Sequence, residues 1–239
     1  MYLYKKLNLN TKMGEVISLV GGGGKTTTLY TLANELKEIG HKVLVTTTTA
    51  IYSPEGGYDY YFLKDLENDY NPIEGSITVL GSRIKNGKLL GFSLDKMADI
   101  IDRKLFDFIL IEADGAKGKP IKAPASYEPV VPEKTCKTIG IIGLDALDKR
   151  IEDIAHRPEI FIRITDKQLT DRVDEDAIIR CVLHEKGLFK GAYGERVLIL
   201  NKAFNDGLIL RGNRIREKLY QEGFKGSILV TNIKSKQIY

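Results

Sequence analysis

The chain has 239 residues, of which 43% are hydrophobic and 28% are charged, as in a globular protein. We predict one domain over residues 1–239, large enough to bury a sizeable core and to carry an insertion. The formal net charge of +4 could serve phosphate ligands, but it is too small to indicate nucleic-acid binding.

Cysteine use and the first residues indicate the compartment. Cys136 and Cys181 lie far apart and outside any Cys-x-x-Cys motif, which predicts a reducing compartment and no zinc site. Residues 1–12 mix polar and apolar side chains and form neither a signal peptide nor a membrane span. We therefore expect a cytoplasmic protein without a membrane partner.

Residues 15–28 carry the strongest pattern, in which a β-branched apolar run is followed by four glycines, a lysine and three threonines. Glycines let backbone N–H groups turn toward phosphate oxygens without a clash from Cβ. The N-terminus of a following helix also favours anions. The predicted nucleotide-binding loop consists of Gly21, Gly22, Gly23, Gly24, Lys25, Thr26 and Thr27.

In a phosphate-binding loop the lysine contacts the β/γ-phosphates of ATP or GTP and the next hydroxyl ligates Mg²⁺, which assigns these roles to Lys25 and Thr26. Lys25 is expected to contribute charge but no core packing, so its removal should leave the fold intact. Leu19 replaces the usual first glycine, as in variant loops of metal-chaperone and signal-recognition NTPases. The second signature lysine of many such loops is Val20 here. The alternative is a glycine turn that binds nothing.

The flanking pattern predicts a βαβ unit with a strand over 15–20, a helix over 26–39 and a strand over 42–46. A mostly parallel sheet with a right-handed crossover should follow. The second strand runs into Thr46–Thr49, whose hydroxyls could approach Mg²⁺ or the γ-phosphate, because ligands bind at the carboxyl ends of parallel strands. Threonines also favour strands without any further role.

The next segments predict an insertion before the chain returns to the sheet. Residues 53–75 predict an irregular connection with a short helix near 63–66. Residues 77–90 predict a strand and a small β-hairpin that turns at Asn86-Gly87. Residues 94–105 predict a helix.

Residues 106–115 form the second strong motif, an apolar strand that ends in acids. In phosphate-loop NTPases an acid at this place holds Mg²⁺, directly or through water. Glu112 has the spacing of a switch motif to Gly115, and Asp114 is the competing acid. We predict Lys25, Glu112 and Asp114 as catalytic residues and Thr26 with Glu112 as metal ligands. The alternative is a strand that ends in an ordinary polar turn.

A lysine-rich loop follows this strand, with Lys117, Lys119 and Lys122 among glycines and prolines. A basic loop beside a phosphate site predicts contacts to phosphates or to an anionic substrate. The alternative is a solvated loop, since scattered lysines usually have no specific partner.

The second half of the chain predicts further alternation of strands and helices. Strands are expected over 138–143, 195–200 and 227–231, and helices over 174–186 and 211–223. Asn201 and Lys202 open a guanine-reading motif and are predicted nucleotide contacts, although Phe204 stands where that motif has its aspartate. His156, as a lone histidine, is expected to be structural.

Motif segments follow one another at 20–27, 46–49, 112–124, 143–147, 156–159, 187–191 and 200–202. In this order they resemble the YqeC family of accessory proteins for selenium-dependent molybdenum hydroxylases, also called selenium cofactor biosynthesis proteins. The resemblance extends over nearly the whole chain and implies a role in hydroxylase maturation, with a molybdenum hydroxylase or its cofactor-maturation proteins as partners. Tyr127 stands where we expect a histidine of the family.

We therefore predict an α/β fold like that of P-loop NTPases, with a mostly parallel sheet flanked by helices and a small β-hairpin insertion. The first hypothesis is a Mg²⁺-dependent NTPase that serves cofactor maturation. The second is a small-molecule kinase acting on an anionic substrate. The third is a nucleotide-switched carrier or scaffold with little turnover.

Overall fold

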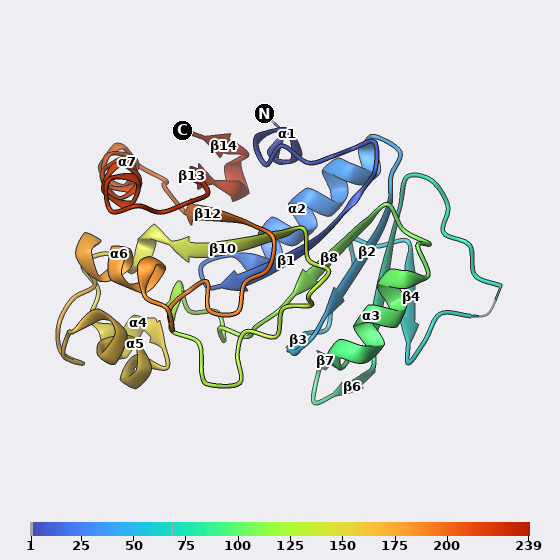
Figure 1. Ribbon diagram of the computed structural model, residues 1–239, viewed down its shortest axis with the longest axis horizontal. Helices are drawn as coiled ribbons and strands as arrows, with labels where there is room; N and C mark the ends of the chain where they lie inside the picture. The colour runs from blue at the N-terminus through green and yellow to red at the C-terminus, as the bar shows by residue number, and fades with distance from the viewer. Residues whose placement is uncertain (1, 68) are drawn as a thin grey trace.

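The structure, a computed structural model, describes residues 2–67 and 69–239. A nine-stranded sheet crosses the molecule with helices on both faces (Figure 1). Neighbouring strands are parallel except β13 and β14. This arrangement confirms the predicted α/β class. Across the sheet the strands are β14 (Gln237–Ile238), β13 (Ser227–Asn232), β12 (Glu195–Asn201), β10 (Lys137–Gly143), β1 (Glu15–Gly21), β8 (Phe108–Glu112), β2 (Lys42–Thr47), β5 (Ser76–Gly81) and β4 (Tyr60–Leu63).

Helices α1 (Leu3–Lys6) and α2 (Lys25–Glu38) cover one face of the sheet, where the apolar face of α2 shares a buried cluster with β1 and β8. On the other face α3 (Leu94–Asp102) packs near β8 and β5. The same face near β10 and β12 is covered by α6 (Glu175–Leu183) and α7 (Asp206–Gln221). The short helices are α4 (Ile151–Ile154), α5 (Pro158–Thr165), η1 (Leu144–Ala146) and η2 (Ile233–Ser235).

The central strands are buried on both faces, which explains their unbroken apolar runs. β8 lies between β1 and β2, with Glu112 opposite Leu19 on one side and opposite Thr47 on the other. This register brings the end of β1, the acid at the end of β8 and the threonines after β2 to one edge of the sheet. That edge is where parallel sheets bind ligands.

The predicted hairpin insertion is confirmed. β6 (Arg83–Lys85) and β7 (Lys88–Leu90) pair antiparallel around Asn86 and Gly87, whose φ values of 51° and 69° suit a tight turn. β3 (Ala50–Tyr52) adds a third strand to this small sheet. β9 (Ile121–Lys122) and β11 (Ala155–His156) form another short pair.

The short helix predicted near residues 63–66 is wrong. Residues 60–63 form β4, which pairs parallel with β5, because consecutive aromatic side chains favour an extended, half-buried edge strand. Asn68, in the same predicted connection, lies outside the described residues. The helix predicted from 211 begins at Asp206, since the Asn205 side chain accepts a hydrogen bond from Leu208 N–H and caps it.

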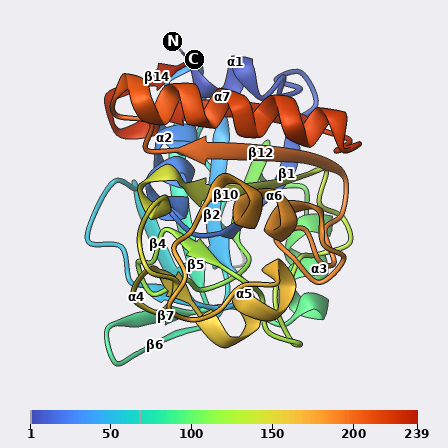
Figure 2. The same cartoon turned by 90° about the vertical axis from the view of Figure 1, so that its left-hand side faces the viewer.

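Other boundaries differ by a few residues. The helices predicted to end at 105 and 186 end at Asp102 and Leu183. The short elements α1 and β14 lie together near the two termini, beside α2 and β13 (Figures 1 and 2). Over the described residues, no helix combines the length and apolar character needed to cross a bilayer.

Candidate functional site

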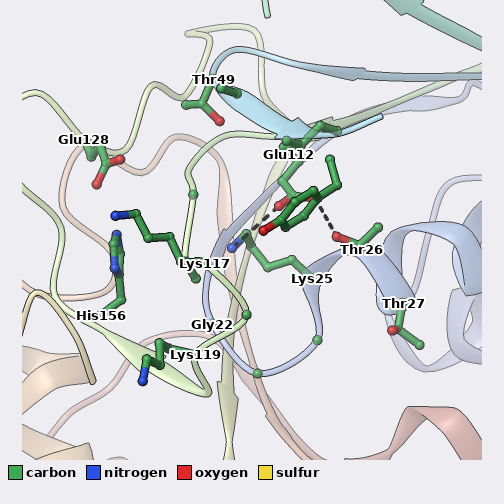
Figure 3. Close-up of a pocket in the computed structure, with 18 of the residues that line it drawn as sticks. Gly22, Lys25, Thr26, Thr27, Thr49, Glu112, Lys117, Lys119, Glu128 and His156 are labelled. Carbon is green, nitrogen blue, oxygen red and sulfur yellow. Dashed lines mark hydrogen bonds and ion pairs between the residues drawn. The ribbon is translucent and has the colours of Figure 1, made fainter. Parts of the chain in front are cut away.

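A pocket of about 490 Å³ lies at the carboxyl edge of the sheet, beside the glycine-rich loop. Its size suits a small-molecule ligand. Segments far apart in the sequence contribute side chains to it, as Figure 3 shows. The lining residues are Gly22, Gly23, Gly24, Lys25, Thr26, Thr27, Thr49, Ala50, Ile51, Tyr52, Lys88, Glu112, Gly115, Ala116, Lys117, Gly118, Lys119, Glu128, His156, Arg157 and Lys202.

The glycine-rich loop joins β1 to α2, as the sequence predicts. Gly23 requires its small size, because its φ is 79° and a Cβ there would lie 2.1 Å from the nitrogen of Gly143. The backbone N–H of Gly22 donates to Ile141 O at 2.8 Å, and that of Gly23 donates to Lys119 O at 3.0 Å. Hydrogen bonds thus hold Gly22 and Gly23 within the loop, and the first turn of α2 supplies further N–H donors at the pocket.

Lys25 is almost fully buried at the start of α2. Its Nζ donates to Gly21 O at 2.6 Å and lies 3.1 Å from Asp114 Oδ1 and 3.7 Å from Glu112 Oε1. Burial disfavours the charged form of the Lys25 amine, but the attraction of Asp114 and Glu112 is larger than this effect. The pKa of the amine is therefore raised. The side chain is therefore a permanent cation folded back onto the loop.

Thr26 and Glu112 meet at the pocket floor. The Thr26 hydroxyl donates to Glu112 Oε2 at 3.0 Å, and in Figure 3 Lys25 and Thr26 both point toward this carboxylate. Burial raises the pKa of Glu112, although Lys25 and Thr26 act in the opposite direction. Thr27 is exposed and also lines the pocket.

Asp114 lies beneath the pocket with Lys122 and does not line it. The carboxylate of Asp114 accepts from Gly21 N–H at 3.0 Å and lies 3.1 Å from Lys122 Nζ. Lys122 is 1% exposed and also donates to Gly115 O and Glu128 Oε2, at 2.8 and 2.9 Å. The structure therefore separates Lys122 from Lys117 and Lys119, with which the sequence grouped it as an anion contact.

Asn201 supports the loop from behind. Its Nδ2 donates to Gly23 O at 2.9 Å, and its Oδ1 accepts from Ile233 N–H at 3.0 Å. Asn201 does not line the pocket, whereas Lys202 lines it and donates to Asp145 Oδ2 at 2.8 Å. Of the predicted nucleotide contacts after β12, the structure thus brings Lys202 to the cavity.

The threonines at the end of β2 and directly after it divide between structural and pocket positions. The hydroxyl of Thr47 donates to Glu112 O at 2.7 Å, which ties the ends of β2 and β8 together. That of Thr48 donates to Val130 O at 2.7 Å. Thr49 lines the pocket.

The wall opposite the glycine-rich loop is built from two distant segments. Arg157 pairs with Glu128 and donates to the Tyr127 hydroxyl at 3.0 Å. Burial acts to raise the pKa of Glu128, but Arg157 and Lys122 hold it below its usual range. Burial, Lys122 and Arg157 lower the pKa of His156 to about 4, so this imidazole is neutral at pH 7.

Sequence reasoning missed this wall. His156 was expected to be structural, and Glu128 and Arg157 carried no prediction, yet all three line the pocket. Lys117, which was predicted, completes the wall. Lys119, also predicted, lines the pocket beside the glycine-rich loop, where its backbone O accepts from Gly23 N–H. The signal was the polar His-Arg-Pro-Glu cluster at 156–159, which leads into α5.

The fold and the cavity define an α/β protein with a glycine-loop site at the carboxyl edge of a parallel sheet. The family model described as YqeC protein matches residues 17–159, which include the glycine-rich loop, the acids after β8 and His156. A protein of Escherichia coli (strain K12) described as "Uncharacterized protein YqeC" is 33% identical over 183 residues, which are 75% of this chain and 72% of that protein. The chain belongs to the YqeC family.

Proposed function

We propose that the protein binds a nucleoside triphosphate with Mg²⁺ at the glycine-rich loop, hydrolyses it, and serves the maturation of selenium-dependent molybdenum hydroxylases. One observation carries the nucleotide part: Lys25, Thr26 and Glu112 converge within a 490 Å³ pocket where a glycine-rich loop enters a helix. A cation, a hydroxyl and an acid in this order are the groups that phosphoryl transfer requires.

The Thr26–Glu112 pair fits a magnesium ion. Oxygen ligands of octahedral Mg²⁺ at bond lengths of 2.0–2.1 Å lie about 2.9 Å apart, and the two side-chain oxygens are 3.0 Å apart. Over residues 2–67 and 69–239, no group of three or more His, Cys, Asp or Glu is placed to hold a metal ion. The remaining ligands would be phosphate oxygens and water, as is usual for Mg²⁺. When bound, the ion supplies charge neutralisation to the phosphates.

Lys25 has to change partners when a nucleotide binds. Its amine leaves Gly21 O and Asp114 and turns to the phosphate oxygens, and its raised pKa keeps it charged in both positions. Lys122, 3.1 Å from Asp114, continues to balance that acid. We therefore assign Lys122 the role of a buried counter-ion for Asp114. Because Asp114 keeps this partner, the movement of Lys25 does not leave a buried carboxylate unpaired, which lowers its free-energy cost.

A calorimetric screen of ATP, GTP and CTP, with and without Mg²⁺, tests the nucleotide site. We expect triphosphate binding that needs Mg²⁺ and weakens about tenfold or more in Thr26→Ala, since one metal ligand is lost. Thr31→Ala, on the same helix but outside the pocket, is the matched control. Absence of binding by all three nucleotides, or equal binding without Mg²⁺, would contradict the proposal.

The side chain of Asn201 is engaged with Gly23 and Ile233, and Phe204 is 60% exposed at the position of the guanine-reading aspartate. Neither residue supports selective recognition of guanine. We therefore expect ATP to bind at least as well as GTP in this screen.

The maturation role rests on the resemblance of the ordered segments to the accessory proteins of the YqeC family, to which the comparisons add membership in that family. Deletion of the gene in a host with such a hydroxylase should lower hydroxylase activity and its selenium content, and the parent gene should restore both. A gene carrying Thr26→Ala should not. Normal activity and normal selenium content in the deletion strain would contradict this role.

A further inference from the structure

The lining of the pocket carries more positive than negative side chains. Two glutamates line it, so the lining carries a net charge of +4, the same as the formal net charge of the whole chain. Pairing of Lys202 with Asp145 lowers this surplus by one charge. A nucleoside triphosphate with Mg²⁺ brings about −2, so positive charge remains. The cations of the lining are Lys25, Lys88, Lys117, Lys119, Arg157 and Lys202.

These cations lie on both sides of the Thr26–Glu112 pair. The order of strands places Lys202, after β12, on one side of β1. Glu112 and the segment after β2 lie on the other side of β1. A triphosphate bound at the loop, with Mg²⁺ at Thr26 and Glu112, has its terminal phosphate beside Glu112. The cavity wall that faces this terminal phosphate is therefore the one that carries Lys117, after β8, Glu128, after β9, and His156 with Arg157, at the end of β11.

This wall holds its side chains in a fixed arrangement around His156. In Figure 3 the side chain of Lys117 points away from the glycine-rich loop toward Glu128 and His156. Arg157 is fixed by Glu128 and lies over the Tyr127 ring, with its guanidinium carbon 5.4 Å from the ring centroid. Within the part of the chain that the structure describes, Lys117 has no acid within 4.0 Å.

Burial is the largest cause of the low pKa of His156, and the cations around the imidazole act in the same direction. Lys122, Arg157 and Lys117 oppose its protonation, and Glu128 is the one facing group that favours it. An anion placed against the same groups would favour protonation of His156. Lys117 and Arg157 thus offer positive charge to an anion beside the one carboxylate of the wall, Glu128.

We propose that Lys117, His156 and Arg157 bind a second, anionic substrate that carries a phosphate or a similar oxyanion, next to the nucleotide. The placement beside the terminal phosphate rests on the proposed function. The charge surplus and the geometry of the wall do not depend on it. The two ligands occupy one pocket at the same time, with the Thr26–Glu112 pair between them.

Calorimetry of the full chain with inorganic phosphate tests the second site, in the presence of saturating Mg²⁺ and a non-hydrolysable ATP analogue. Phosphate should bind to this complex, and Lys117→Gln should weaken phosphate about tenfold while changing nucleotide affinity much less. Lys225→Gln removes an exposed lysine outside the pocket, before β13, and should change neither affinity. Competition between phosphate and nucleotide, or an unchanged phosphate affinity in Lys117→Gln, would overturn the proposal.

The His156 resonance gives a second readout, because the chain has three histidines and their NMR signals can be assigned by substitution. Bound phosphate should raise the pKa of His156 from about 4, and the rise should be smaller in Lys117→Gln. If no nucleotide binds, the proposed function is refuted, but the second anion site is not. The phosphate titration then still decides: a His156 shift that depends on Lys117 supports the second site, and no shift refutes it.

Discussion

Lys25→Ala should destabilise the folded protein, contrary to the expectation from sequence that Lys25 carries charge without a structural role. The amine lies 3.1 Å from Asp114 and 3.7 Å from Glu112, and these acids are 2% and 6% exposed. At an effective dielectric constant of about 20, each attraction is about 4–5 kcal/mol before the cost of burying the charges. Removing one partner from a buried ion pair costs about 3–5 kcal/mol.

Lys122 continues to balance Asp114, so we expect a loss near the lower end, about 3 kcal/mol in the free energy of unfolding at pH 7. The loss should shrink at lower pH. The pKa of Glu112 is already raised in the folded protein, and without Lys25 it rises further. A raised folded-state pKa adds stability below the pKa of the unfolded chain, and this stability is lost as pH increases through the folded value.

Urea denaturation followed by circular dichroism at pH 5 and pH 7.5 measures both effects. The matched double variant combines Lys25→Ala with Glu112→Gln. At pH 7.5 it should be more stable than Lys25→Ala alone, because Glu112→Gln removes the buried negative charge that Lys25 no longer balances. A loss below about 1 kcal/mol at pH 7.5, or a loss that grows toward pH 5, would refute this reasoning.

Four further substitutions test the site. Glu112→Gln should abolish the dependence of nucleotide binding on Mg²⁺ whereas Asp114→Asn should keep it, and calorimetry showing equal Mg²⁺ dependence in both would place the metal elsewhere. Gly23→Ala should cost about 2–3 kcal/mol or more in urea denaturation, because its φ is 79° and Cβ meets Gly143; an unchanged midpoint would argue against the loop geometry. Asn201→Ala removes hydrogen bonds to the loop and should cost about 1–3 kcal/mol and weaken nucleotide binding, which full retention of both would contradict.

The first βαβ unit and the acid after β8 could be predicted because their signals are local. A β-branched run, glycines and a helical repeat follow one another within 15–39, and each indicates its own conformation. Glu112 directly ends an apolar strand, so its place at the carboxyl edge followed from the sheet.

The opposite wall could not be predicted because it depends on how two loops return to the same cavity. Arg157 and Glu128 are 29 residues apart and meet as an ion pair. Lys117 and Lys122 look alike in sequence, but one is exposed and the other is buried against Asp114 and Glu128. Local patterns do not distinguish a buried counter-ion from a solvated lysine.

A crystal structure of the full chain with Mg²⁺ and a non-hydrolysable ATP analogue tests the central claim most directly. We predict the triphosphate at the first turn of α2, Mg²⁺ bound by the Thr26 hydroxyl and near Glu112, and Lys25 Nζ moved from Asp114 to the phosphates. A nucleotide bound elsewhere, or Lys25 still paired with Asp114 beside a bound triphosphate, would contradict the account.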